Sequence, residues 1–102
     1  MRAERPFRFG LVAGRTGGAR QWAELSRRAE ALGFDTLLVP DVVGGPAPMI
    51  AAAAAAAATT NLRVGSYVLV AAFRRPRMLA WEASTLHQLS GGRFELGLGA
   101  GR

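Results

Sequence analysis

Short apolar runs alternate with segments of helical spacing along the whole chain, and glycine, proline or polar clusters separate them. The apolar runs predict strands at 7–13, 34–40, 62–70 and 93–98, and each segment between them predicts a helix. The second run is apolar at successive positions, as in a strand that is covered on both faces. Strands that alternate with helices in this way predict a parallel α/β sheet with right-handed crossovers.

Each of the three expected helices has its own signal. Apolar residues in the first recur at spacings of three and four, and the other two each open at a proline. Glycine at position 33 suits the end of the first helix, because it adopts a positive φ at little cost. The residues that carry these signals are Trp22, Leu25, Ala29, Leu32, Pro48 and Pro76.

The number of units bounds the architecture. Units of about 25 to 30 residues fit either a (β/α)8 barrel or a doubly wound sheet, and a complete barrel needs about 250 residues. This chain has 102 residues and ends directly after the fourth expected strand. We therefore expect a fragment, the N-terminal half of a larger protein, whose fourth strand would be an exposed apolar edge in isolation.

Charge and composition argue against several classes of partner. The 13 basic residues exceed the 7 acidic ones by 6, and all 13 are arginine. They are dispersed except at 74–77, without the interleaved aromatics of a nucleic-acid site, so we expect no nucleic-acid partner. The chain has no cysteine and no metal-ligand spacing, and no apolar run approaches the roughly 20 residues that span a bilayer. We expect a cytoplasmic protein with no metal and no membrane association.

Candidate functional residues follow from the expected topology, because parallel α/β folds bind ligands at the carboxyl ends of their strands. Asp41 follows the second strand and either accepts a hydrogen bond from a ligand or caps its own loop. Tyr67 lies near the end of the third strand, where it either stacks on a planar ligand or fills the core. The glycines at 97–101 resemble the start of a dinucleotide fingerprint, but Arg102 stands where the third glycine is needed.

Several phrases, taken in order, resemble the bacterial luciferase-like monooxygenase superfamily, in particular its branch that uses the deazaflavin coenzyme F420. The phrase LSGGRFELGLGAG at 89–101 is the most specific of them. The others are ALGFDTL at 31–37, VPD at 39–41, TTNLRVGSYV at 59–68, RP at 75–76 and TL at 85–86. Together they cover nearly the whole chain from Phe7.

This resemblance implies a TIM (β/α)8 barrel, of which residues 1–102 would be one truncated domain, the N-terminal half with about four βα units. It implies an oxidoreductase that binds coenzyme F420, or FMN as the alternative, at the carboxyl end of the barrel and acts on a small organic substrate by hydride or oxygen chemistry. The complete protein would be a homodimer, and the fragment alone would be inactive.

The resemblance also implies cofactor-binding residues and a non-prolyl cis peptide between Tyr67 and Val68, behind the cofactor ring. The implied cofactor-binding residues are Asp41, Tyr67, Val68, Gly99, Ala100 and Arg102. Two positions depart from the pattern, because Val42 stands where relatives often carry histidine and Arg102 where some carry glutamate. The catalytic acid or base is therefore not assigned.

Two other interpretations remain open at this level. The chain could be the N-terminal part of a Rossmann-type dinucleotide-binding domain, which shares the alternation of strands and helices. It could also be a small basic, non-enzymatic binding module, which its net charge of +6 would suit.

Overall fold

The computed structural model describes residues 7–101. Its strands are β1 (Gly10–Val12), β2 (Thr36–Val39), β3 (Arg63–Ser66), β4 (Leu69–Val70), β5 (Phe94–Glu95) and β6 (Leu98–Gly99). Its helices are α1 (Ala19–Ala31), α2 (Pro48–Ala58), α3 (Pro76–Leu89) and the short 3-10 helix η1 (Ala71–Phe73). The expected order of strands and helices is confirmed, although each of the last two expected strands is divided into two short ones.

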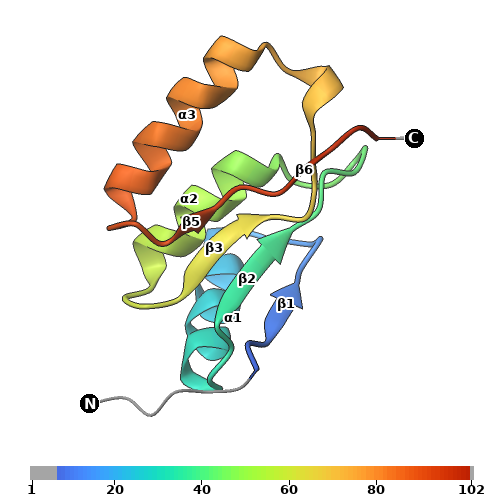
Figure 1. Ribbon diagram of the computed structural model, residues 1–102. Helices are drawn as coiled ribbons and strands as arrows, with labels where there is room; N and C mark the ends of the chain where they lie inside the picture. Colours follow the sequence, from blue (N-terminus) through green and yellow to red (C-terminus); the bar gives the residue numbers. More distant parts are fainter. Residues whose placement is uncertain (1–6, 102) are drawn as a thin grey trace.

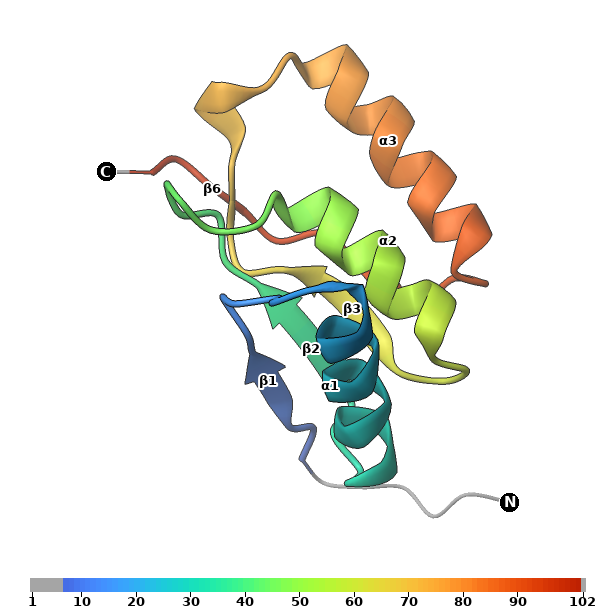
Figure 2. The same cartoon turned by 180° about the vertical axis from the view of Figure 1, so that it is seen from behind.

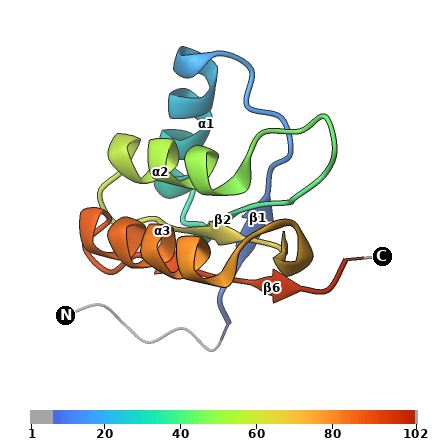
Figure 3. The same cartoon turned by 90° about the horizontal axis from the view of Figure 1, so that it is seen from above.

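The strands form parallel pairs in sequential order. β1, β2, β3 and β5 make one sheet in that order, and β4 pairs with β6 (Figure 1). Figures 1 and 2 show α1 and α2 on one face of the sheet, and α2 lies between α1 and α3 in Figure 3. A doubly wound sheet would reverse its strand order and carry helices on both faces. Within residues 7–101 neither is seen, so the dinucleotide-domain interpretation is wrong and a one-sided barrel wall is formed.

The core lies between the strands and the helices. Leu37, Val39 and Val64 are fully buried on the helix-facing side of the sheet. They pack against the alanine face of α2, whose small side chains let the helix approach the strands closely; the buried alanines are Ala51, Ala52, Ala55 and Ala56. Trp22 of α1 also packs here, and its indole N–H donates to the Ala51 carbonyl at 2.8 Å.

Three large apolar residues of the helices lie outside the core, and one of them, Leu32, was expected on the buried face of the first helix. The first helix ends at Ala31, so Leu32 is its C-cap rather than part of its buried face and is 70% exposed. Gly33 follows with φ 90°, as predicted for the residue after the cap. Trp81 and Leu89 of α3 are also exposed, on the side of the helix that borders the open groove between α2 and α3.

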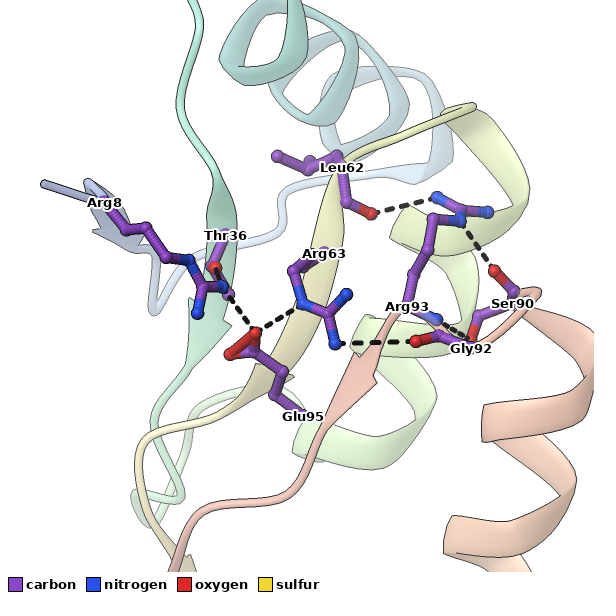
Figure 4. Close-up of polar contacts among 8 residues, drawn as sticks. All are labelled: Arg8, Thr36, Leu62, Arg63, Ser90, Gly92, Arg93 and Glu95. Carbon is purple, nitrogen blue, oxygen red and sulfur yellow. Dashed lines mark hydrogen bonds and ion pairs between the residues drawn. The ribbon is translucent and has the colours of Figure 1, made fainter. Parts of the chain in front are cut away.

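Arg93 connects the ends of two helices. Its guanidinium donates to the carbonyls of Leu62 and Ser90 at 3.0 and 2.6 Å (Figure 4). It also donates to the Ala56 carbonyl and to the Thr59 hydroxyl, each at 3.0 Å. Ala56 and Thr59 lie at the end of α2, and Ser90 caps α3. Arg93 therefore supplies a charged donor to carbonyl groups at the C-terminal ends of both helices.

Glu30 binds the backbone N–H groups of the turn before β3. Its carboxylate accepts hydrogen bonds from the backbone N–H groups of Thr60, Asn61 and Leu62 at 2.6 to 3.3 Å. Burial opposes ionisation, but these three hydrogen bonds outweigh it, so the pKa of Glu30 lies below its ordinary value.

Charged residues gather on the sheet face opposite the helices. Arg8 donates to Glu95 at 2.6 Å and to Thr36 at 3.2 Å, and Arg63 donates to the same Glu95 oxygen (Figure 4). Burial raises the pKa of Glu95, but the two arginines outweigh it and hold that pKa below its ordinary value. No helix in the described part of the chain is long and apolar enough to cross a membrane.

Candidate functional site

Each of the last two expected strands is interrupted near the carboxyl edge of the sheet. Tyr67 and Val68 separate β3 from β4, and Leu96 and Gly97 separate β5 from β6. The Tyr67–Val68 peptide is cis, as the sequence resemblance predicts. The two breaks lie next to each other, because the Leu69 N–H donates to the Gly97 carbonyl at 2.7 Å.

Glycines make this close approach possible. The Ser66 hydroxyl donates to the Gly97 carbonyl at 2.9 Å and accepts from the Gly97 N–H at 3.0 Å, and a Cβ at position 97 would overlap the Ser66 carbonyl. A Cβ at Gly99 would stand 2.6 Å from Val68 Cγ2. The missing side chain at 99 is therefore the space into which Val68 fits.

Apolar side chains are exposed at this edge. Tyr67 is 60% exposed and Val68 is 39% exposed. Val12 is paired in register with Leu38, on the opposite side of the sheet from the partly buried Leu11 and the buried Leu37, and is 51% exposed. Exposed apolar surface often marks a binding site, and this surface suits contact with the face of a planar ring.

Asp41 supplies a carboxylate beside this apolar surface. Its Oδ2 accepts a hydrogen bond from Arg74 Nη1 at 2.6 Å and from the Val70 N–H at 2.8 Å. The side chains of Asp41 and Arg74 are 13% and 23% exposed. The hydrogen bond from Arg74 is the main cause that lowers the pKa of Asp41; burial opposes it and the Val70 N–H assists.

The structure brings together three of the residues that the sequence predicts for the site. Val70 donates to Asp41 and is paired with Gly99, and Gly99 in turn lies against Val68. Ala100 is exposed directly after β6. Arg102 lies outside the described residues.

Sequence reasoning missed Arg74. It stands in a run of arginines at 74–77 that reads as a solvated basic rim, and nothing in the run distinguishes one member from the others. The sequence signal that could have indicated Arg74 is its position, four residues after the end of the third expected strand. From there a long side chain can reach back toward the loop that follows β2.

A groove of about 420 Å³ lies elsewhere, between α2 and α3. Its walls are apolar apart from Glu82 and Thr85, and they include the exposed side chains of Ile50, Met78, Trp81 and Leu89. This groove is on the helix side of the molecule, so it is separate from the site at the strand ends.

Parallel βα units in sequential order, with helices on one face of the sheet, are the arrangement that forms the wall of a (β/α)8 barrel. The model of the luciferase-like monooxygenase family matches residues 6–102, and the chain belongs to this family. Its solved structural neighbours are TIM barrels, so the expected fold class is confirmed: residues 7–101 form parallel βα units of the N-terminal portion of that barrel.

Two curated relatives are named for coenzyme F420. A Mycobacterium tuberculosis protein named as a coenzyme F420-dependent oxidoreductase is 37% identical over 98 residues, covering 94% of this chain and 28% of the relative. The F420-dependent glucose-6-phosphate dehydrogenase of Amycolatopsis mediterranei is 37% identical over 93 residues, covering 82% of this chain and 28% of that relative. The chain thus spans little more than a quarter of the length of these relatives.

Two solved structures share the fold closely. The coenzyme F420-dependent tetrahydromethanopterin reductase of Methanopyrus kandleri has a TM-score of 0.85 at 27% identity, over 93% of this chain and 27% of that one. The oxygenating constituent of 3,6-diketocamphane monooxygenase from Pseudomonas putida, in complex with FMN, has a TM-score of 0.81 at 25% identity, over 93% and 30%.

Proposed function

We propose that this chain belongs to an oxidoreductase that uses coenzyme F420 to transfer hydride to or from a small organic substrate. The observation that carries the proposal is the exposed apolar segment Tyr67–Val68 beside the ionised carboxylate of Asp41 at the strand ends. The curated relatives named for coenzyme F420 support the deazaflavin. FMN, with oxygen chemistry, is the alternative that the Pseudomonas putida structure supports.

The residues at the strand ends fit a planar cofactor ring. Val68 presents an apolar surface that keeps water away from one ring face, and the missing side chain of Gly99 leaves the space in which Val68 lies. Ala100 follows directly after β6 and is exposed at the same edge. Asp41 can accept one hydrogen bond from a ring N–H or O–H group. The cofactor, when bound, supplies the hydride chemistry, and these residues bind and orient it. Tyr67 and Arg102 complete the set of proposed cofactor-binding residues.

The proposal is tested with the complete gene product, purified and titrated separately with coenzyme F420 and with FMN. We expect F420 to bind at least about tenfold more tightly, a difference of about 1.4 kcal/mol. Reduced F420 should then be oxidised in the presence of a reducible organic substrate. A folded protein that binds neither cofactor would contradict the proposal. Preferential binding of FMN would instead support the alternative, an FMN-dependent enzyme with oxygen chemistry.

Residues 1–102 alone are proposed to be inactive. The described strands form only part of a barrel wall, and the sheet face opposite the helices carries no covering helix within residues 7–101. Turnover of reduced F420 or reduced FMN by the purified 102-residue polypeptide as a monomer would contradict this.

We also propose that the protein is a homodimer, formed through the groove between α2 and α3. Trp81, Ile50, Met78 and Leu89 are 68%, 74%, 50% and 81% exposed there, and Glu82 is the one charged residue that lines the groove. An apolar face of two neighbouring helices complements a second copy of itself. Sedimentation velocity should show that Trp81→Glu dissociates the dimer while Val43→Glu, at a fully exposed loop position, does not. A monomeric unsubstituted protein would contradict this proposal.

A further inference from the structure

Asp41, Val70 and Arg74 form a closed set of hydrogen bonds between two loops. Asp41 Oδ2 accepts from Arg74 Nη1 at 2.6 Å and from the Val70 N–H at 2.8 Å, and Arg74 Nη1 also donates to the Val70 carbonyl at 3.0 Å. Asp41 belongs to the loop after β2, whereas Arg74 follows η1. The set therefore holds the end of β2 against the end of β4.

Both donors bind the same carboxylate oxygen. Among residues 7–101, the structure shows two hydrogen bonds to Asp41 Oδ2 and none to Oδ1. An ionised carboxylate accepts about four hydrogen bonds, so Oδ1 remains available to a further donor. With only 13% of the side chain exposed, a ligand that covers this edge would bury Oδ1 and would have to supply that donor.

Arg74 is distinguished from its neighbour Arg75 by these contacts. Arg75 is the N-cap of α3 and is exposed, and within the described residues its guanidinium makes no hydrogen bond or ion pair. The two arginines carry the same charge one position apart, so a comparison of their substitutions separates the directed contact from the general effect of a positive charge.

We propose that Arg74 is a positioning residue of the cofactor site, which fixes Asp41 through Oδ2 so that Oδ1 accepts a hydrogen bond from an N–H or O–H group of the bound ring. This inference rests on the proposed function. It assigns to Arg74 no contact with the cofactor or the substrate. The ligand group that meets Asp41 Oδ1 must be a hydrogen-bond donor. The Asp41–Arg74 pair therefore also determines which ligands can bind.

The proposal has a consequence for the pH dependence of binding. Protonation of Asp41 would place an O–H donor at Oδ1, opposite the donor of the ligand, because Oδ2 already accepts from Arg74 and Val70. Arg74 is the charged group that favours the ionised form. Cofactor affinity should therefore fall as the pH falls through the lowered pKa of Asp41. Replacing Arg74 with a neutral residue raises that pKa, so the loss of affinity should begin at a higher pH.

The experiment uses the complete gene product with Arg74→Gln, Arg74→Lys and, as the matched control, Arg75→Gln. Titration with coenzyme F420 gives Kd as a function of pH, and 13C NMR of labelled aspartate gives the pKa of Asp41 without the cofactor. We expect Arg74→Gln to weaken F420 binding about tenfold, to raise the pKa of Asp41 and to move the acid limb of the Kd profile upward in pH. Arg74→Lys should restore part of the affinity, and Arg75→Gln should resemble the unsubstituted protein.

Equal effects of Arg74→Gln and Arg75→Gln on Kd would overturn the inference. So would a tenfold loss of affinity with an unchanged acid limb, because that result describes a structural role alone. Failure of the unsubstituted protein to bind either F420 or FMN overturns the proposed function instead. The NMR measurement distinguishes the two failures, because Arg74→Gln still raises the pKa of Asp41 when only the function is wrong.

Discussion

Val68 lies against Gly99 so closely that a Cβ at position 99 would stand 2.6 Å from Val68 Cγ2. The two residues are 31 positions apart: Val68 lies in the break between β3 and β4, and Gly99 is the last residue of β6. The glycine thus determines where the Val68 side chain can lie, and Val68 is the apolar surface that the proposed cofactor ring would contact.

Gly99→Ala should displace Val68. Overpacking of this kind costs about 1–3 kcal/mol in the free energy of unfolding, and we expect cofactor affinity to fall with it. Chemical denaturation measures the first effect and titration with F420 the second. The double variant Gly99→Ala, Val68→Ala should recover much of the stability. Gly14→Ala is the control, because its Cβ would meet Pro40 Cγ at an ordinary 3.4 Å. Equal stability of Gly99→Ala and Gly14→Ala would contradict the packing described.

Val68→Asp should weaken cofactor binding by several-fold or more. The substitution would place a carboxylate without a partner against the ring, and burial of an uncompensated charge is costly. Ala57→Asp adds the same charge at an exposed position near the C-terminal end of α2 and should leave Kd unchanged. Fluorescence titration of both variants measures the difference. Unchanged affinity in Val68→Asp would remove this residue from the site.

Arg93→Ala should destabilise the protein by about 3 kcal/mol, because it leaves the carbonyls of Ala56, Leu62 and Ser90 without their charged donor. Arg77→Ala, at an exposed position of α3, should change the free energy of unfolding by less than about 0.5 kcal/mol. Denaturation with urea compares the two. A similarly small loss in the free energy of unfolding for both variants would show that the Arg93 hydrogen bonds do not stabilise the packing of α2 and α3.

Glu30→Gln should remove stability that depends on pH. Because the pKa of Glu30 is lowered in the folded state, its contribution is complete above the unfolded pKa of about 4.3 and is lost as the pH falls through the folded value. We expect a loss of about 1–2 kcal/mol at pH 7 that shrinks below about pH 4.3. Glu24→Gln, on the exposed face of the same helix, is the control. A loss that does not vary with pH would contradict the assignment.

The order of elements could be predicted because the pattern of apolar residues changes with each element. Pro48 and Pro76 mark the true starts of α2 and α3, and Gly33 follows the end of α1 with a positive φ. The breaks at Tyr67–Val68 and Leu96–Gly97 could not be found from this pattern, because the apolar character continues through both. Only the resemblance to a family indicated the first break.

Polar contacts between residues far apart in the sequence were harder to predict than the order of strands and helices. Asp41 could be proposed because any residue just after a parallel strand lies at the ligand edge. Its partner Arg74 could not, since the pairing spans 33 positions and depends on how η1 turns the chain. The exposure of Trp81 could not be predicted for a similar reason, because spacing places a residue on a helix face but does not say what covers that face.

The position of the cofactor ring is the central claim, and methyl NMR of the complete gene product tests it most directly. With valine and isoleucine methyl groups labelled, coenzyme F420 should shift the Val68 methyl resonances and leave those of Ile50, in the groove between α2 and α3, unchanged. FMN should shift the same Val68 resonances at higher concentration. Saturable shifts at Ile50 with none at Val68 would contradict the account, because the ring would then bind on the helix side of the sheet.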